Sequence, residues 1–228
     1  MTRELLADLL DRNEEHVGSA AAADLDARRD GQRPPVVSVC CSDSRVSQEG
    51  MWAVDRPGFL FTAGNIGNRV SSVVDGDRVL SGSVAYPLGH TGTDVLAVVG
   101  HTGCGAVGAA LAAVRDGAVP DEPGVRADVA ELAPIVEAGL AAIDDDDGTD
   151  ASLRNRLVEH NVHEQVAIAR GTETAADADV YGFVYDFHGA YGDRSGAVYL
   201  VNANGERDPE ALRELVALDH VDSVASLL

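Results

Sequence analysis

Two short segments carry residues that could bind a metal ion. The segment VVSVCCSDSRV is an apolar run that ends in Cys41, Asp43 and Arg45. The segment VVGHTGCGAVG places His101 and Cys104 directly after another apolar run. Thiolate and imidazole are ligands that zinc prefers, and three protein ligands leave a fourth position open, as in catalytic zinc sites. Cys41, His101 and Cys104 are therefore candidate zinc ligands.

The third cysteine, Cys40, is the neighbour of Cys41. Successive residues of a strand point to opposite faces of the sheet, so both thiols are not expected to bind one ion. We expect Cys40 to be a small core residue. A redox thiol pair is a poorer interpretation of the cysteines, because Cys41 and Cys104 form no C-x-x-C motif.

The elements that must position these residues follow from hydrophobic patterning. Strands alternating with helices predict an α/β fold with a largely parallel central sheet, flanked by helices and preceded by an N-terminal helical arm. We expect one domain over residues 1–228, with 118–150 as an acidic surface insertion and DDDDGTD as a mobile loop. Strands are predicted within 36–40, 57–68, 93–101, 179–187 and 196–205. Helices are predicted from Arg3 through 19–29 and within 75–90, 104–117, 126–143, 151–170 and 208–218.

Charge and composition narrow the class of protein. Acidic residues outnumber basic ones 38 to 17, the formal net charge is -21, and every basic residue is arginine. Such a surface repels nucleic acid and anionic membranes, so we expect neither as a partner. It is typical of proteins from halophiles, in which salt screens the self-repulsion. The N-terminus lacks the apolar core of a signal peptide and no run spans a membrane, so we expect a soluble, cytoplasmic protein.

A different site is suggested by GCGAVG, from Gly103 to Gly108. It is a G-x-G-x-x-G motif that follows a strand and opens a helix, which is the context of a dinucleotide site. The acidic residue expected about 20 positions later falls in the loop PDEPGV, and the motif leaves Cys104 unexplained. Small residues that let a helix pack close to the sheet explain the glycines better. A non-catalytic nucleotide-binding module remains an alternative, as does a structural zinc domain.

The pair CSDSR and GHTGCGAVG resembles the two signatures of the β-class carbonic anhydrases. AGNIGN, SVAYPLGHTGTDVLAVVGH, HNVHEQV and VYGFVYDFHGAYG resemble further segments of that family, so the resemblance runs from Gln32 to Asn202. It implies a doubly wound parallel sheet and a homodimer or higher homo-oligomer. It also implies that Cys41, His101 and Cys104 bind zinc and that Asp43 and Arg45 form a dyad beside the metal.

The spacing of Gln32 and Tyr86 from the ligands is similar to that in plant-like members of the family. The resemblance implies that Gln32 hydrogen-bonds substrate and that Tyr86 lines an apolar pocket shared across the dimer. Phe61 and Gly103 are the other substrate-binding candidates. Some members have a tryptophan where this chain has Ser38, and that residue helps to build a regulatory bicarbonate pocket, so we expect no such pocket here.

The expected reaction is the reversible hydration of CO₂ to bicarbonate and a proton by zinc-bound hydroxide. Arg45 can hold Asp43 ionised through a bidentate pair, and Asp43 can then accept the proton of the hydroxide. Asp43 could instead be the fourth zinc ligand and close the site, and the two states exclude each other. The same site acting on carbonyl sulfide or carbon disulfide is a further alternative.

Overall fold

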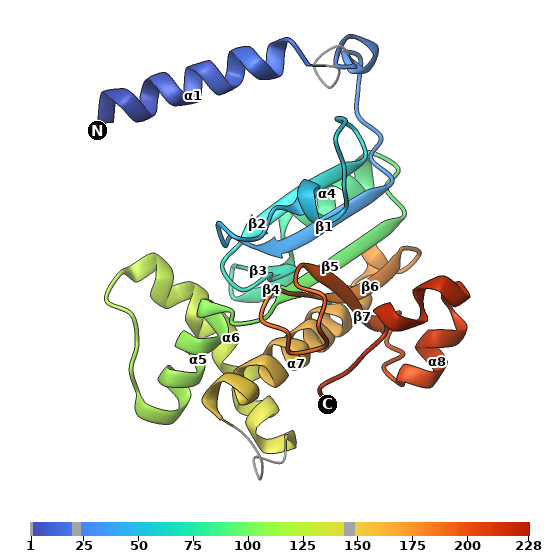
Figure 1. Ribbon diagram of the computed structural model, residues 1–228. Helices are drawn as coiled ribbons and strands as arrows, with labels where there is room; N and C mark the ends of the chain where they lie inside the picture. Colours follow the sequence, from blue (N-terminus) through green and yellow to red (C-terminus); the bar gives the residue numbers. More distant parts are fainter. Residues whose placement is uncertain (1, 20–23, 144–148) are drawn as a thin grey trace.

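A five-stranded sheet forms the centre of the molecule (Figure 1). The computed structural model describes residues 2–19, 24–143 and 149–228. The strands of the sheet are β1 (Val36–Cys41), β2 (Leu60–Asn65), β5 (Val95–His101), β6 (Asp179–Asp186) and β7 (Ala197–Ala203). Their order is β2-β1-β5-β6-β7; the first four are parallel, and β7 is antiparallel to β6. The prediction of an α/β fold with a largely parallel sheet is confirmed.

The two central strands end side by side. β1 pairs with β5 in parallel, in a register that joins Cys40 to Val99. Cys41 is the last residue of β1, and His101 is the last residue of β5. Because parallel strands present their carboxyl ends at one edge of the sheet, the pairing itself brings the two predicted ligands together.

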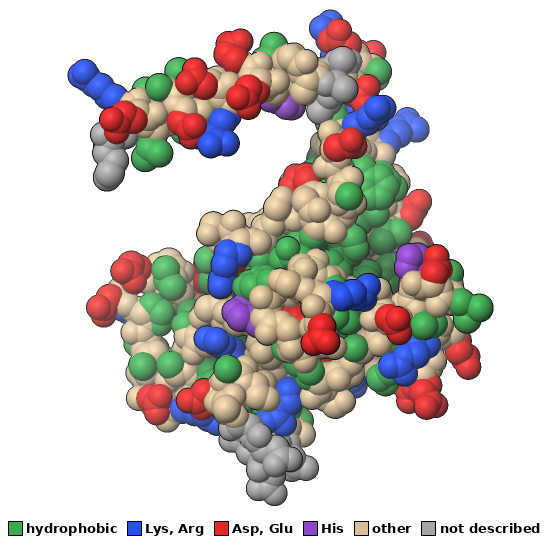
Figure 2. All heavy atoms as spheres, viewed as in Figure 1, with side chains coloured by type: hydrophobic (Ala, Val, Ile, Leu, Met, Phe, Trp, Pro, Cys, Tyr) green, Lys and Arg blue, Asp and Glu red, His purple; other side chains and the backbone are tan. Residues whose placement is uncertain are grey.

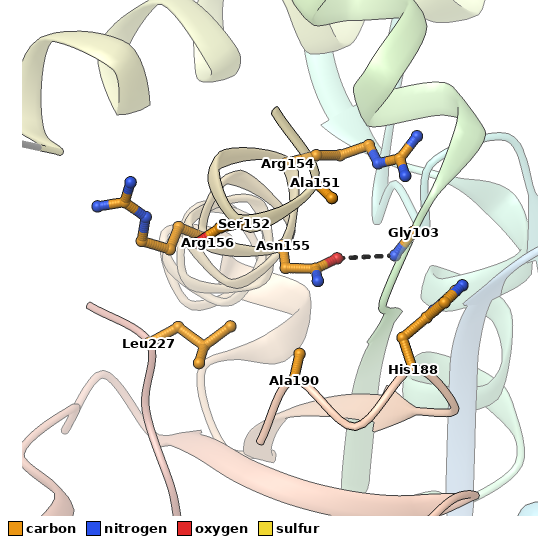
Figure 3. A pocket seen from close by; sticks show the side chains of 9 residues that line it. All are labelled: Gly103, Ala151, Ser152, Arg154, Asn155, Arg156, His188, Ala190 and Leu227. Carbon is orange, nitrogen blue, oxygen red and sulfur yellow. Dashed lines mark hydrogen bonds between the residues drawn. The ribbon is translucent and has the colours of Figure 1, made fainter. Parts of the chain in front are cut away.

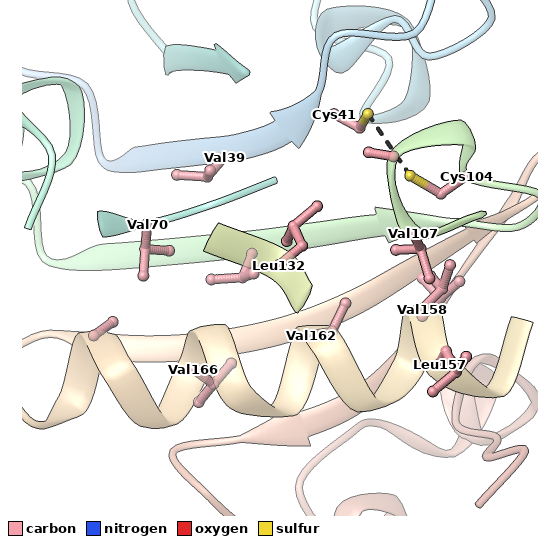
Figure 4. Close-up of a cluster of buried hydrophobic side chains, with 14 of the residues drawn as sticks. Val39, Cys41, Val70, Cys104, Val107, Leu132, Leu157, Val158, Val162 and Val166 are labelled. Atoms are coloured by element: carbon pink, nitrogen blue, oxygen red, sulfur yellow. Dashed lines mark hydrogen bonds between the residues drawn. The ribbon is translucent and has the colours of Figure 1, made fainter. Parts of the chain in front are cut away.

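Three helices cover one face of the sheet: α5 (Gly105–Asp116), α6 (Pro123–Ala142) and α7 (Asp150–Arg170). Figure 4 shows α7 lying along the strands with Val158, Val162 and Val166, four residues apart, turned into the core. Burying each of these side chains stabilises the fold by roughly 1.5–3 kcal/mol. Gly100 and Gly182 make the close approach possible, since a Cβ at either would lie 2.7 Å from Val162.

The opposite face of the sheet carries a smaller cluster, formed by Cys40, Ala97 and Val99. The short helix α3 (Gln48–Met51) leads into Trp52, whose ring meets Phe183 edge-on at 5.2 Å between centroids. Burial in this cluster raises the pKa of Cys40 to about 12. The prediction that Cys40 is a core residue facing away from Cys41 is confirmed.

The first part of one predicted helix is a strand of a β-hairpin. Residues 75–90 were expected to be helical throughout, but β3 (Ser71–Val74) and β4 (Asp77–Leu80) form an antiparallel pair, and α4 (Gly82–His90) begins only after it. Asp75 and Gly76 join the strands with φ of 54° and 93°. An Asp-Gly pair with both φ values positive is the preferred two-residue hairpin turn. The prediction was wrong here because this turn outweighs the helical spacing of the apolar residues.

The N-terminal helix is shorter than predicted. α1 (Thr2–Val17) projects away from the sheet as an arm (Figure 1), with Leu5, Leu6, Leu9 and Leu10 exposed. It does not continue through 19–29, because Gly18 and Ser19 form a turn and a separate 3-10 helix, η1 (Asp26–Arg28), follows. The arm itself is confirmed, and the single long helix was wrong.

The segment 118–150 contributes to the core. α6 begins at Pro123, which suits the first turn of a helix, and buries Val129, Leu132 and Val136. Its description as an insertion stays a prediction, and most of the predicted loop DDDDGTD lies outside the described residues.

After α7, the chain forms η2 (Glu173–Ala175) and the β6–β7 pair. The closing helix α8 (Pro209–Glu214) is shorter than the predicted 208–218 and is followed by η3 (Leu218–Ser223). Figure 2 shows acidic side chains spread over the visible face, including α1. Among the described residues, every helix is too short or too polar to cross a membrane.

Candidate metal centre

Cys41, His101 and Cys104 meet at the carboxyl edge of the sheet. Their ligand atoms all lie within 4.8 Å of one another. Cys41 and His101 end adjacent strands, and Cys104 immediately precedes α5. The three residues are 8%, 0% and 1% exposed. The predicted ligand set is therefore gathered at one buried point.

The two thiols share a single hydrogen bond. The Sγ atoms of Cys104 and Cys41 are 3.9 Å apart (Figure 4). The bond from Cys104, aided by His101 and the Gly67 N–H against the effect of burial, lowers the pKa of Cys41. The same bond, together with burial, raises the pKa of Cys104. The shared bond thus favours the thiolate of Cys41 over that of Cys104, and a negative charge there would attract a cation.

The ring of His101 has one nitrogen left to bind a metal. Nδ1 lies 3.1 Å from the carbonyl oxygen of Thr102, so it carries the proton and donates it there. Nε2 is buried and has no hydrogen-bond partner among the described residues. An orphaned buried nitrogen beside two thiols is the donor set of a Cys₂His zinc site. The residues present therefore fit zinc.

Asp43 and Arg45 form the predicted dyad. Nε of Arg45 donates to Oδ1 of Asp43 at 2.9 Å, and Nη2 donates to Oδ2 at 2.6 Å. The side chain and the backbone N–H of Arg45 hold the pKa of Asp43 well below its usual range despite some desolvation. Oδ2 of Asp43 lies 3.8 Å from Nε2 of His101. In the structure Asp43 is thus paired with Arg45, and its alternative role as a fourth ligand stays an untested alternative.

The aromatic wall of the site was not predicted. The ring of Phe187 stacks on His101 with centroids 5.7 Å apart, and the guanidinium of Arg45 lies 4.7 Å from the centre of the same ring. Behind it, Thr102 Oγ1 donates to the buried Asp186 at 3.1 Å. Asp186 and Phe187 end and follow β6, the parallel neighbour of β5. The place of a carboxylate at a third strand end was a signal that could have identified Asp186, whereas the stacking of Phe187 depends on the pairing of β6 with β5.

Gly103 is enclosed by other side chains. Its N–H donates to Oδ1 of Asn155 at 2.8 Å (Figure 3), and with φ of 69° a Cβ would lie 2.6 Å from the ring of His188. A cavity of about 480 Å³ lies beside it, and Figure 3 shows Arg154 and Arg156 pointing away from each other around it. The N–H of Gly103 is thus already committed, and its role in substrate binding stays a prediction.

The remaining substrate-binding candidates lie at the other end of the sheet. Gln32 lines a hollow at the amino ends of β1 and β2. Phe61 pairs with Val37, which precedes Cys41 by four residues, or about 13 Å of strand. The ring of Tyr86 is near Phe61, with centroids 6.2 Å apart, and the residue is 48% exposed. Within one chain Phe61 and Tyr86 lie together, and neither they nor Gln32 join the metal ligands.

Comparison with known proteins points to one family. The profile described as "Carbonic anhydrase" matches residues 36–192. Carbonic anhydrase 2 of Mycobacterium tuberculosis is 34% identical over 153 residues, which cover 67% of this chain and 66%, slightly less than two thirds, of that protein. A carbonic anhydrase of Pseudomonas aeruginosa is 32% identical over 161 residues, which cover 68% of this chain and 70% of that one.

Solved structures share the fold. One of two tetrameric β-carbonic anhydrases from Sordaria macrospora superposes with a TM-score of 0.72 at 18% identity, covering 87% of this chain and 98% of that one. A Coccomyxa β-carbonic anhydrase in complex with acetazolamide superposes with a TM-score of 0.70 at 23% identity, covering 90% and 91%. The sheet and helices described above are thus those of this group of structures.

Proposed function

The chain belongs to the β-class carbonic anhydrase family, and on that premise we propose that it catalyses the reversible hydration of CO₂ to bicarbonate and a proton with zinc as its cofactor. The observation that carries the proposal is the buried Cys41, His101 and Cys104 cluster beside the Asp43–Arg45 pair. Zinc, when bound, lowers the pKa of a coordinated water towards ~7 and so supplies a nucleophile at neutral pH.

Asp43 orients that nucleophile. Because Arg45 keeps it ionised, Asp43 can only accept hydrogen bonds. Its Oδ2 lies 3.8 Å from Nε2 of His101 and can accept a hydrogen bond from an attacking hydroxyl, which would turn the lone pair of that hydroxyl towards CO₂. A carboxylate that was protonated would donate instead and would misdirect the hydroxyl. Arg45 thus acts by holding both the charge and the position of Asp43.

The apolar part of the site is proposed to come from a second copy of the chain. Gln32 lines a hollow at the amino ends of β1 and β2, and Phe61 near the start of β2 contacts Tyr86, so all three lie away from the metal ligands of their own chain. In a homodimer these residues can face the metal ligands of the partner, where Tyr86 and Phe61 accept the apolar CO₂ and Gln32 hydrogen-bonds the substrate. The tetrameric assembly of the Sordaria relatives supports association of this kind.

Three finer proposals concern the setting of the protein. Ser38 is buried at the position where some members have a tryptophan, and this supports assignment to the plant-like branch without the regulatory bicarbonate pocket. The net charge of -21 and the absence of lysine support a halophilic origin, and a cytoplasmic location is proposed with it. A melting temperature that does not rise between low and molar KCl would contradict the halophilic origin.

The reaction is tested by stopped-flow measurement of proton release after mixing with CO₂, in molar KCl, with and without a zinc chelator. Chelator-sensitive acceleration is expected. Cys41→Ala is expected to lose zinc and activity together, whereas Cys40→Ala, a change to the neighbouring buried thiol outside the cluster, is expected to keep both. Absence of acceleration in zinc-loaded protein across pH 7 to 9 would reject CO₂ as the substrate and direct the assay to its sulfur analogues.

A further inference from the structure

The loop after β2 touches the metal centre through a single backbone group. The N–H of Gly67 points at Sγ of Cys41 across 3.5 Å. Gly67 has φ of 83°, and a Cβ there would lie 2.5 Å from Leu132 of α6. The positive φ and this contact both favour glycine at this position. The N–H therefore approaches the sulfur at a place where a larger residue would be strained.

Two buried amides on α7 hold this loop. Asn161 donates from Nδ2 to the carbonyl oxygen of Gly67 and to Oδ1 of Asn68, both at 3.2 Å. Gln165, one helical turn later, accepts from the N–H of Val70 at 2.9 Å and donates to Oδ1 of Asn161 at 3.1 Å. Both side chains are 1% exposed. Together they fix both ends of the Gly67–Val70 segment to the helix.

The side chain of Asn65 holds the loop together through two further hydrogen bonds. Asn65 accepts from the N–H of Arg69 at 2.7 Å and donates to its carbonyl oxygen at 2.8 Å. Arg69 in turn donates to the carbonyl oxygen of Ile66 at 3.2 Å and pairs with Asp128 of α6. The whole turn from Asn65 to Val70 is thus tied to itself and to two helices.

Burying the amides of Asn161 and Gln165 costs more free energy of desolvation than burying apolar side chains at the same positions would. They lie on the face of α7 that otherwise carries Val158, Val162 and Val166. Apolar side chains of similar shape would pack there without the need to satisfy every donor and acceptor. The amides instead fix the position of the loop. The loop contacts the metal centre through the N–H group of Gly67, so that group is what the amides hold in place.

We propose that Asn161 and Gln165 are positioning residues for the metal centre, which act through the loop to hold the Gly67 N–H on the sulfur of Cys41. A hydrogen bond to a ligand sulfur withdraws electron density from it and orients the lone pair that faces the metal. Groups that orient metal ligands in this way commonly change metal affinity by about 10- to 100-fold. The inference rests on the proposed zinc site but not on the proposed reaction.

The test uses full-length Asn161→Ala and Gln165→Met, with Asn202→Ala as the matched control. Asn202 is equally a buried amide, which binds His163 and the Gly205 N–H away from the loop. Each protein is loaded with Co²⁺ to record its thiolate-to-cobalt charge-transfer band and is titrated with Zn²⁺ against a competing chelator. Asn161→Ala and Gln165→Met are expected to move the band to longer wavelength and to weaken zinc binding about tenfold or more. Asn202→Ala is expected to match wild type in both.

Equal band positions and affinities in all three variants would overturn the proposal, since the amides would then matter only for stability. If Asn161→Ala does not fold, Gln165→Met still decides the question, because it keeps Asn161 on Gly67 but frees Val70. In wild-type protein loaded with ¹¹³Cd, the Gly67 amide proton is expected to couple to the metal through the sulfur, and absence of that coupling also overturns the proposal.

The outcomes separate this inference from the proposed function. Wild-type protein that binds no Zn²⁺ or Co²⁺ would reject the zinc site itself. Protein that binds zinc and shows the expected spectral shifts but does not hydrate CO₂ would reject only the reaction.

Discussion

At the scale of single residues, the state of Asp43 decides what the site can do. Its carboxylate accepts three hydrogen bonds from Arg45, two from the side chain and one from the backbone. These bonds hold its pKa well below the usual range, so Asp43 stays ionised at every pH above about 4. We therefore expect any change of activity between pH 6 and pH 9 to arise from a group other than Asp43.

Asp43→Asn is expected to keep zinc, because Asp43 is outside the cluster of ligand atoms. Turnover is expected to fall about 100-fold or more, since the amide can present an N–H where an acceptor is required. The measurements are zinc content and proton release with CO₂. Asp55→Asn, at an exposed position outside the site, serves as the control. Full activity in Asp43→Asn would remove Asp43 from the mechanism.

The ligands and the dyad could be predicted from the sequence because their residue types are distinctive and each follows an apolar strand. Phe187 and Gly67 could not. The stacking of Phe187 on His101 depends on the neighbouring position of β6, and the N–H of Gly67 is a backbone group that any residue type carries. A residue whose role depends on its position and not on its side-chain type can be identified only once the fold is known.

At the scale of elements, α7 ties distant parts of the chain together. Its buried Glu159 accepts from the hydroxyl of Tyr191 at 2.6 Å, from Ser226 Oγ at 2.5 Å and from the Leu227 N–H at 2.8 Å. Burial acts to raise the pKa of Glu159, but these bonds and one from His163 outweigh it and lower the pKa. The charged carboxylate therefore anchors the C-terminal segment to the helix.

Glu159→Gln is expected to lower the free energy of unfolding at pH 7 by about 1–3 kcal/mol, because an amide cannot accept all of these bonds. The folded pKa is below the ordinary value of about 4.3, so the contribution of the carboxylate is complete above about pH 5 and is lost as the pH falls through the folded pKa. Urea unfolding at several pH values measures this, with exposed Glu137→Gln as control. A deficit that is the same at pH 3.5 and pH 7 would contradict this account.

Most elements were predictable because strands and helices of this chain show clear apolar periods. The exceptions have local causes. The Asp75-Gly76 turn converted part of a predicted helix into β4, and the turn at Gly18 ended α1 before the alanine-rich segment. In both places the conformational preference of a few residues outweighed a longer hydrophobic pattern. The hydrophobic pattern by itself does not show at which residue a helix or strand ends.

At the scale of the whole molecule, the proposed site residues fall into two groups on the sheet, and for this reason the proposed site requires two copies of the chain. The metal ligands lie at the carboxyl edge, and Gln32, Phe61 and Tyr86 lie near the amino edge. A sheet strand of six residues separates the two groups by roughly 17 Å. One copy of the chain thus holds both halves of the proposed site without joining them.

A mixture of two inactive variants is expected to recover activity. Cys41→Ala removes the metal half of the site, and Gln32→Ala with Tyr86→Ala removes the pocket half. If the site is shared, a heterodimer contains one intact site, and random exchange of subunits at equal amounts restores about a quarter of the wild-type sites. The assay is proton release with CO₂ before and after subunit exchange. Activity that stays at the sum of the separate variants would reject the shared site.

The position of the ligands on β1 and β5 has a consequence for the order of folding. Cys41 and His101 become neighbours only when these two strands pair, and β2, the β3–β4 hairpin and α4 lie between them in the chain. Bringing β1 and β5 together loses the conformational entropy of the long segment between them. The burial of apolar side chains must offset this loss of entropy before the ligands can come together. Zinc should therefore enter after the folding transition state, leaving the folding rate unchanged and slowing unfolding.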